Sequence, residues 1–356
     1  MMMRKEILGA CCALIAGVAA GDYVVTSYGA KPDGATDNTA AIQKAIDDCA
    51  AKGGGRVLVP GGGKYVTYTL NLKNNVELHI DRGATLLGGE DPLKYPVFET
   101  NAVWNAERSP RFNRRAMFYT VGQTNVAITG AGTIDGNAEK FHHEEKHNNW
   151  TGYRWFRNSH TNITGRCVFF VGCRDVTVSD CIVHSQDDAL ILRTHQEQMK
   201  KPRPCERVVV NNCILNSYGA YAIRIGWTGD GPVRDIVVDN IVSTVSRHGI
   251  GFTLPPEPPA PKEYMDPPRG RGLVPPPLSE RLPFYAENIH FSNMTIYGSR
   301  APLDISIGDN QRVDYIKNIS FSHCRFKSPN LPRTRFHERN NVRDWCFSDV
   351  VFEIGE

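Results

Sequence analysis

The amino-acid sequence predicts an all-β protein, a single-stranded, right-handed parallel β-helix (solenoid) with a short capping helix at its N-terminal end. Three observations lead to this fold class. A six-residue pattern recurs through the second half of the chain, a short strand pattern follows most of its copies, and one helical pattern lies near the N-terminus. Solenoids grow by adding turns, so 356 residues fit a single domain.

The repeated pattern has apolar residues at its first and third positions and usually Asp, Asn or His at its fifth. Such alternation is typical of a half-buried strand that ends in a turn. Clear copies occupy residues 176–181, 208–213, 236–241, 289–294 and 319–324, with weaker ones at 126–130 and 345–350. Strands this short cannot bury a face alone, so we expect stacked turns with an interior column formed by the sixth residues: Cys181, Cys213, Ile241, Met294 and Cys324.

A second short strand is expected after several copies, at residues 189–193, 222–226, 249–253 and 303–307. Near the N-terminus, Ile42, Ile46 and Cys49 recur at helical spacing. Residues 36–38 provide a start signal for this helix and residues 53–55, all Gly, provide a stop. We expect this helix to cover the open end of the solenoid.

Two segments are expected to lie outside the regular coils. Residues 1–20 have the charged start, apolar centre and small final residues of a secretory signal, which predicts a secreted or periplasmic protein with a domain at 21–356. Residues 254–283 hold half of the 22 prolines and form an insertion within the repeat array. This insertion is either a surface loop or a stiff flap over a binding cleft.

The composition excludes several classes of partner. A net charge of +3 gives no overall field for nucleic acid or a membrane surface, and no stretch after the signal is long and apolar enough to cross a bilayer. We expect a monomer without a cofactor. The cysteines at repeat positions are read first as small buried side chains and second as disulfides.

Several segments resemble the opening of the glycoside hydrolase family 28 polygalacturonases, within the pectate-lyase superfamily of right-handed β-helices. They are residues 27–39, 53–60, 83–86 and 130–136, in the order found in that family. The resemblance implies a parallel β-helix with a carbohydrate cleft on one outer face. It also implies a pectic polysaccharide or oligosaccharide, containing galacturonate or rhamnogalacturonan, as substrate of a hydrolase.

The family's four signature motifs can be compared with this chain one at a time. Asp187-Asp188 matches the family's Asp-Asp motif, and the resemblance implies that Asp187 is the general acid and Asp188 helps to activate water. Residues 164–166 replace Asn-Thr-Asp, residues 220–222 replace Gly-His-Gly, and residues 251–253 replace Arg-Ile-Lys. The alternative for the Asp pair is a purely structural role as turn residues at a strand entry.

Other polar and aromatic residues near the same strands are candidates for the site. His248 is a candidate acid, base or sugar ligand in place of the missing family histidine. Guanidinium groups pair bidentately with carboxylates, and aromatic rings stack on sugars. The expected substrate-binding residues are therefore Arg166, Arg193, Tyr221, Arg224 and Trp227. As a structural alternative, each arginine forms only a weak surface pair.

Two further functions remain open from the sequence. A polysaccharide lyase would use Ca²⁺ held by carboxylates and a base such as Arg224. A non-catalytic carbohydrate-binding β-helix would also account for the altered motifs. Residues 143–147 match the His-Glu-x-x-His pattern of zinc proteases, but their charged, Asn-rich surroundings lack the apolar stripe of a helix. Adventitious metal binding or a role in the wall of the cleft is therefore favoured over a metalloprotease.

Overall fold

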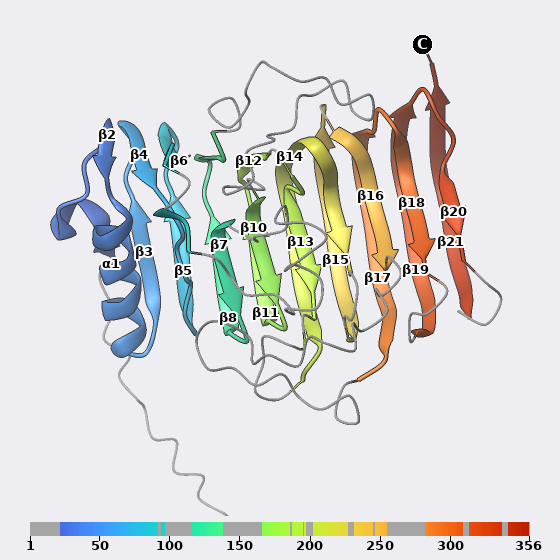
Figure 1. Cartoon of the computed structure of the whole chain (residues 1–356), viewed down its shortest axis with the longest axis horizontal. Coiled ribbons are helices and arrows are strands. Elements are labelled where there is room, and N and C mark those ends of the chain that lie inside the picture. The colour runs from blue at the N-terminus through green and yellow to red at the C-terminus, as the bar shows by residue number, and fades with distance from the viewer. Residues whose placement is uncertain are drawn as a thin grey trace, which may run out of the picture.

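The computed structural model describes residues 22–91, 94–96, 116–137, 166–185, 187–194, 196, 202–226, 231–244, 246–254, 282–308, 313–336 and 341–355. The expected signal, the zinc-protease pattern, Trp227 and most of the Pro-rich insertion lie outside these residues. Within them the chain forms the right-handed parallel β-helix that the sequence predicts. Its strands pair in parallel from one coil to the next (Figure 1).

The first of three sheets contains the repeated sequence pattern. Its strands are β1 Tyr23–Val24, β3 Gly55–Val59, β5 Val76–Ile80, β8 Thr124–Thr129, β11 Arg174–Ser179, the start of β14 Cys205–Ile225, and the starts of β15 Val233–Ser243, β17 Phe284–Tyr297, β19 Val313–Ser328 and β21 Val342–Ile354. The fifth residue of each copy has a left-handed backbone, for example Asp180 at φ 62° and Asn212 at φ 53°. Asn and Asp tolerate this conformation better than most residues, so they turn the chain at the same corner in successive coils.

A second sheet follows this corner and was not expected from the sequence, which suggested two strands per turn rather than three. It contains β2 Asp33–Asp37, β4 Gly63–Thr67, β6 Ala84–Gly88, β9 Thr133–Asp135, β12 Ile182–Ser185 and the continuing parts of β14, β15, β17, β19 and β21. The left-handed residue turns the strand without a loop. From β11 onward, no Gly or Pro signal therefore separates the two strands in the sequence.

The third sheet carries the candidate site. It contains β7 Ala116–Val121, β10 Arg166–Val171, β13 Leu190–Arg193, the end of β14, β16 Ser246–Leu254, β18 Ala301–Ile307 and β20 Arg333–Arg335. These strands include the predicted second strands, although β16 and β18 begin earlier than expected. The chain leaves β16 at Leu254 and enters β17 at Phe284, so the Pro-rich insertion joins the third sheet of one coil to the first sheet of the next.

From residue 22 onward, where the structure is described, the N-terminal region has one α-helix, α1 Thr39–Ala51, and a short 3₁₀ helix, η1 Val25–Tyr28. The apolar spacing predicted α1. Its residues Ile42, Ile46 and Cys49 are buried and join the main core. Figure 1 shows α1 beside the first coils, at the opposite end of the stack from β21.

The interior of the solenoid is filled by columns of apolar residues. The predicted column of sixth residues is buried in all five clear copies, with exposures from 0% at Ile241 to 2% at Met294. The seven cysteines whose side chains are described form no disulfide with one another, and six of them are buried, which favours the small-side-chain interpretation. Ring stacking adds to this order, since Phe291, Phe321 and Phe347 form a ladder with centroid separations of 4.8 and 5.1 Å.

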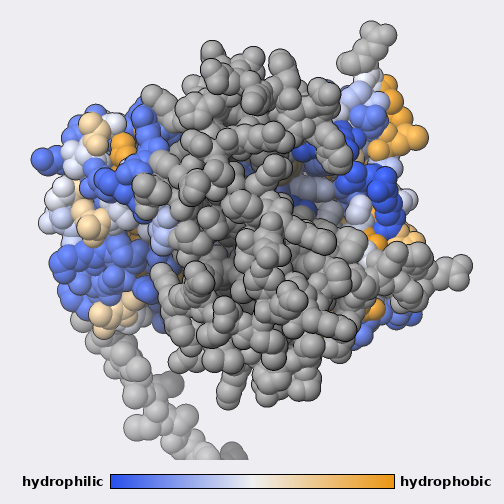
Figure 2. All heavy atoms as spheres, in the orientation of Figure 1, coloured by the Kyte–Doolittle hydropathy of each residue, from blue (hydrophilic) through white to orange (hydrophobic). Residues whose placement is uncertain are grey.

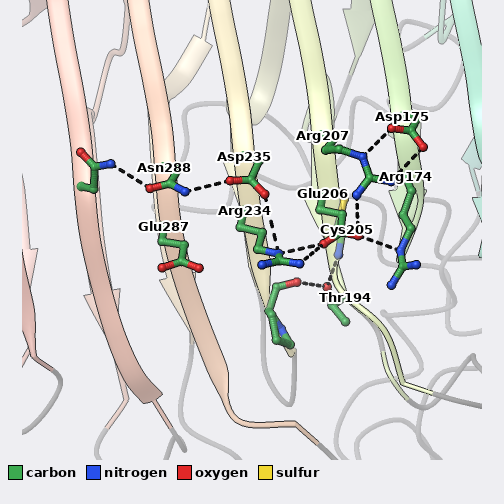
Figure 3. A network of polar contacts seen from close by, with 12 residues as sticks. Arg174, Asp175, Thr194, Cys205, Glu206, Arg207, Arg234, Asp235, Glu287 and Asn288 are labelled. Carbon is green, nitrogen blue, oxygen red and sulfur yellow. Dashed lines mark hydrogen bonds and ion pairs between the residues drawn. The ribbon is translucent and has the colours of Figure 1, made fainter. Parts of the chain in front are cut away.

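A ladder of charged residues crosses the first sheet (Figure 3). Arg174, Glu206, Arg234, Glu287 and Lys317 are paired in register on successive strands, so their charges alternate in sign. Glu206 is almost fully buried and lies 2.9 Å from Arg174 Nε and 2.7 Å from Arg234 Nη2. Ion pairs therefore join Glu206 to Arg174 and Arg234, and Glu287 to Lys317, in addition to the backbone hydrogen bonds between coils.

Polar and apolar surfaces are unevenly distributed. Figure 2 shows apolar residues gathered at the end of the solenoid formed by the last coil, where Phe347, Val351 and Ile354 are exposed. In the described part of the chain, no helix has the length and apolar character needed to cross a membrane.

Candidate active site on the third sheet

One column of outward-facing residues connects five coils of the third sheet. Residues on either side of this column, such as Leu190 and Leu192, point into the core. The alternation of a strand therefore turns the residues between them outward. In order along the stack the column contains Ile191, Arg224, Gly251, Asp304 and Arg333.

Asp187 and Asp188 lie immediately before β13, at the entry to this sheet. Their backbone is fixed from two coils, because Ser185 Oγ donates a hydrogen bond to the Asp188 carbonyl at 3.1 Å and Ser217 Oγ donates to the Asp187 carbonyl at 2.6 Å. The Asp188 amide donates to Asp187 Oδ1 at 2.9 Å. Asp187 is 7% exposed and Asp188 is fully buried. The pair is thus held in one conformation.

Arg224 on β14 is the charged partner of Asp188. Its Nη1 atom lies 3.2 Å from Asp188 Oδ2, and its Nε donates to Thr253 Oγ1 at 2.9 Å. The other carboxylate oxygen of Asp188 accepts a hydrogen bond from the Tyr221 amide at 3.0 Å. A buried carboxylate needs such partners, because an unpaired charge in the interior is strongly unfavourable.

Tyr221 reaches across one coil to a residue on the coil beyond it. Its hydroxyl donates to Asp304 Oδ2 at 2.6 Å, and its ring lies 4.7 Å from the Arg224 guanidinium carbon. A β-carbon added to Gly251 would lie 2.4 Å from the Tyr221 ring, so the ring occupies the space above Gly251. Burial raises the pKa of the Tyr221 phenol well above its usual range, which keeps the hydroxyl a donor.

The contact between Tyr221 and Gly251 accounts for two of the differences between this chain and the family motifs. Tyr221 stands where the resemblance places His, and Gly251 stands where it places Arg. The tyrosine ring fills the region that a side chain at position 251 would enter. Thr253, at the position of the family Lys, accepts a hydrogen bond from Arg224. The altered residues form one connected network.

Replacing Gly251 by Ala is expected to displace the Tyr221 ring and break its hydrogen bond to Asp304. We expect a loss of about 1–3 kcal/mol in the free energy of unfolding, as for other overpacked sites. Urea denaturation of the two single variants, Gly251→Ala and Tyr221→Ala, and of the double variant will measure the coupling. In the Tyr221→Ala background, Gly251→Ala should cost much less. Equal costs in both backgrounds would show that the ring is not the obstacle.

Asp304 on β18 is a central residue of the site that the sequence analysis missed. It is fully buried, forms a bidentate ion pair with Arg333 through Nε and Nη2, and accepts a hydrogen bond from Ser306. Burial by itself would raise the pKa of the Asp304 carboxyl, but hydrogen bonds from Arg333, Ser306 and Tyr221 outweigh it and lower that pKa. The available signal was the alternation in residues 303–307, which turns residues 304 and 306 outward.

His248 on β16 stacks on Tyr221, with ring centroids 4.5 Å apart. It is 6% exposed, and its Nδ1 atom has no hydrogen-bond partner among the described residues; the nearest Asp304 oxygen is 4.0 Å away. Burial, together with the charges of neighbouring arginines, lowers the pKa of the imidazole to about 3 despite the opposing charge of Asp304. The folded protein therefore holds His248 neutral near pH 7.

Because the pKa of His248 is about 3 in the folded protein and about 6.5 in an unfolded chain, stability should fall as the pH decreases through this window. The unfolded state takes up a proton that the folded state refuses, with a slope of up to about 1.4 kcal/mol per pH unit. His248→Gln lacks this contribution. The free energy of unfolding of wild type minus that of the variant should therefore decrease between about pH 6.5 and 4. Parallel curves would contradict the assignment.

The structure brings together five of the predicted site residues: Asp187, Asp188, Tyr221, Arg224 and His248. The other three are placed less completely. Arg193 is buried at the end of β13, paired in register with Val171. Arg166 begins β10, where only its backbone is described, and Trp227 lies outside the described residues.

Comparison with known proteins gives a family for the chain. A 120-residue segment is 41% identical to the exo-poly-α-D-galacturonosidase of Dickeya chrysanthemi, covering 33% of this chain and 19% of that protein. A 276-residue segment is 23% identical to a probable polygalacturonase of Vitis vinifera, covering 64% and 55%. The chain thus spans about a fifth and about half of these relatives.

Among solved structures, an exopolygalacturonase from Thermotoga maritima superposes with a TM-score of 0.48 and 19% identity, over 93% of this chain and 86% of that one. The family model for rhamnogalacturonase A/epimerase, pectate lyase-like proteins matches residues 24–254. That match covers more than half of the sequence and includes the Asp pair, Tyr221, Arg224 and His248. The chain therefore belongs to the rhamnogalacturonase A/epimerase, pectate lyase-like family.

Proposed function

We propose that the protein is an exported glycoside hydrolase that cleaves pectic polysaccharide or oligosaccharide, containing galacturonate or rhamnogalacturonan, by acid–base hydrolysis. The observation that carries this proposal is the fixed arrangement of Asp187 and Asp188 at the entry to the third sheet. Hydrolysis of a glycosidic bond requires one carboxyl group to protonate the leaving oxygen and one carboxylate to activate water or stabilise charge.

The contacts of the two carboxyl groups suit different roles. Asp188 accepts hydrogen bonds from the Tyr221 amide and from Arg224, which stabilise its negative charge. Asp187 is the more exposed of the two, so it is the more accessible to a leaving oxygen. We therefore assign Asp187 as the general acid and Asp188 as the negative charge that supports the water-activating side. Neutral His248 acts as a ligand for the sugar.

The alternative of a lyase receives less support from these contacts. Its base would be Arg224, whose guanidinium is paired with Asp188 and bonded to Thr253. A guanidinium stays protonated in proteins and is a poor base. A binding protein without catalysis would need no acid, yet it could keep the same network, so activity must decide between these functions.

The deciding experiment is incubation with polygalacturonate, rhamnogalacturonan and their oligosaccharides, with and without a chelator. The proposal expects new reducing ends without the absorbance of unsaturated uronates, and no effect of the chelator. Unsaturated products that depend on Ca²⁺ would establish a lyase instead. Binding without any new reducing end would establish a non-catalytic carbohydrate-binding protein.

A further inference from the structure

Asp304 is buried three coils beyond Asp187-Asp188 on the third sheet. Strand β13, which follows the Asp pair, pairs with β14, β14 pairs with β16, and β16 pairs with β18, where Asp304 lies. With strands about 4.8 Å apart, Asp304 lies about 14 Å along the solenoid axis from β13. Because it is fully buried, any effect of Asp304 on the reacting bond must pass through other residues.

Both oxygens of the Asp304 carboxylate accept hydrogen bonds. Oδ1 accepts from Ser306 Oγ and from Arg333 Nε, the latter at 3.0 Å. Oδ2 accepts from Arg333 Nη2 and from the Tyr221 hydroxyl, the latter at 2.6 Å. Charge-assisted hydrogen bonds are roughly twice as strong as neutral ones, and the paired contacts of an arginine also fix direction. Asp304 is therefore suited to hold the Tyr221 hydroxyl in place rather than to exchange a proton.

Tyr221 is bonded in two directions along the stack. Its amide donates to Asp188 Oδ1 and its carbonyl accepts from the Ala189 amide, both at 3.0 Å. Its hydroxyl donates in the opposite direction, to Asp304. The pairing of β14 with β16 is irregular here, because the four residue steps from Ser217 to Tyr221 match two steps on β16. Such a bulge disrupts the regular ladder, so the anchored side chain helps to fix the Tyr221 backbone.

The Tyr221 ring also contacts Arg224, the charged partner of Asp188. The guanidinium carbon lies 4.7 Å from the ring centroid, within the range of a cation–π interaction. The same guanidinium is 3.2 Å from Asp188 Oδ2 and donates to Thr253 Oγ1. Asp188 and Arg224 are both buried, so their relative position depends on protein contacts rather than on solvent. A change in the tilt of the ring would therefore displace the guanidinium that partners Asp188.

We propose that Asp304 is a positioning residue for the reaction, because it anchors the Tyr221 ring that holds the partner of Asp188. The inference rests on the proposed hydrolase function and adds the means by which the orientation of Asp188 is set. Arg333, from the coil beyond, fixes the direction of the anchor. A misplacement of about 1 Å can cost about 10²-fold in rate. A residue that never touches the sugar can therefore control kcat.

Kinetics of three variants of the full chain, on the pectic substrate that the wild type cleaves, test the proposal. Tyr221→Phe removes the hydroxyl that donates to Asp304 but keeps the ring, and it should lower kcat about tenfold. Asp304→Ala removes the acceptor and should lower kcat about 10²-fold. The double variant should match Asp304→Ala within about twofold, because both changes break the same contact. KM should change less than about twofold in each variant, since the contact acts on Asp188 and not on the sugar.

Asp239→Ala is the matched control. Asp239 also accepts hydrogen bonds from the next coil, from Ser292 and Asn293, but it lies in the first-sheet part of β15. This variant should keep the kcat of the wild type. Additive losses in the double variant, a change in KM alone, or an equal loss in Asp239→Ala would overturn the proposal. If Asp304→Ala does not fold, Tyr221→Phe decides alone, and a kcat equal to that of the wild type then overturns it.

Urea denaturation separates this inference from the proposed hydrolase function. The midpoint shifts of Asp304→Ala and Arg224→Gln should not add, and they should add once Tyr221→Leu removes the ring that connects the two residues. This coupling in a protein that never produces reducing ends would support the positioning contact and reject the hydrolase. Hydrolysis with wild-type kcat in Tyr221→Phe would support the hydrolase and reject the inference. Neither hydrolysis nor coupling would reject both.

Discussion

Asp187→Asn is expected to reduce kcat for pectic substrates by about 10²–10⁴-fold, the usual contribution of a general acid. Asn retains an oxygen that can accept the hydrogen bond from the Asp188 amide, which Asp187 Oδ1 accepts at 2.9 Å in wild type. The local turn and the ion pair of Asp188 should therefore survive. The change removes the proton and little else, so KM should change much less than kcat.

The role of Asp187 can be tested further through the leaving group. An aryl glycoside of the same sugar has a leaving group that departs without protonation, so its hydrolysis should depend much less on Asp187. Asp180→Asn is the matched control, because residue 180 turns an outer corner of the same coil and the next coil has Asn212 at that position. Equal losses on natural and aryl substrates would show that Asp187 is not the acid.

Glu206→Gln is expected to destabilise the folded protein by about 3 kcal/mol, near the lower end of the range for breaking a buried ion pair. Glu206 is 2% exposed and is contacted by Arg174, Arg207 and Arg234 (Figure 3). Without its charge, three guanidinium groups converge on a neutral amide and repel one another. The arginines are partly exposed and can turn to water, which limits the loss.

The reciprocal change should be much milder. Arg234→Gln leaves Glu206 with two arginine partners, so we expect a loss of about 1 kcal/mol or less. Urea denaturation followed by circular dichroism measures both variants, with transition midpoints compared directly because stacked repeats can depart from two-state unfolding. A loss for Arg234→Gln as large as that for Glu206→Gln would contradict the central role of the carboxylate.

Much of the fold was predictable because every coil must bury apolar residues and turn at the same corner, and the repeated pattern reflects both requirements. Apolar residues at the first and third positions face the core, and the left-handed fifth residue explains why Asp and Asn recur there. The second sheet was not predictable in this way. Its strands follow the corner without a loop, and in β14 the chain continues as a strand from Cys205 to Ile225 through all three sheets.

The candidate site was predicted only in part, for a related reason. The Asp pair was recognised by local sequence, and Tyr221, Arg224 and His248 by their place on neighbouring strands. Asp304 was missed because its importance depends on contacts with Tyr221 and Arg333, which are 83 and 29 residues away along the chain. The complementarity between the Tyr221 ring and Gly251 likewise depends on the register between coils, which sequence spacing does not define.

Because the coils stack in parallel, the distances between site residues do not depend on how many residues separate them in the sequence. Gly251 and Asp304 are direct neighbours in the third sheet although the Pro-rich insertion separates them in sequence. Adjacent strands lie about 4.8 Å apart whatever the chain does between them. Insertions at the junctions between coils can therefore lengthen or diversify over evolutionary time. The site residues on the third sheet, such as Arg224, Asp304 and Arg333, keep their spacing. Duplication of a whole coil between β14 and β18 would instead separate Tyr221 from Asp304 and divide the site in two.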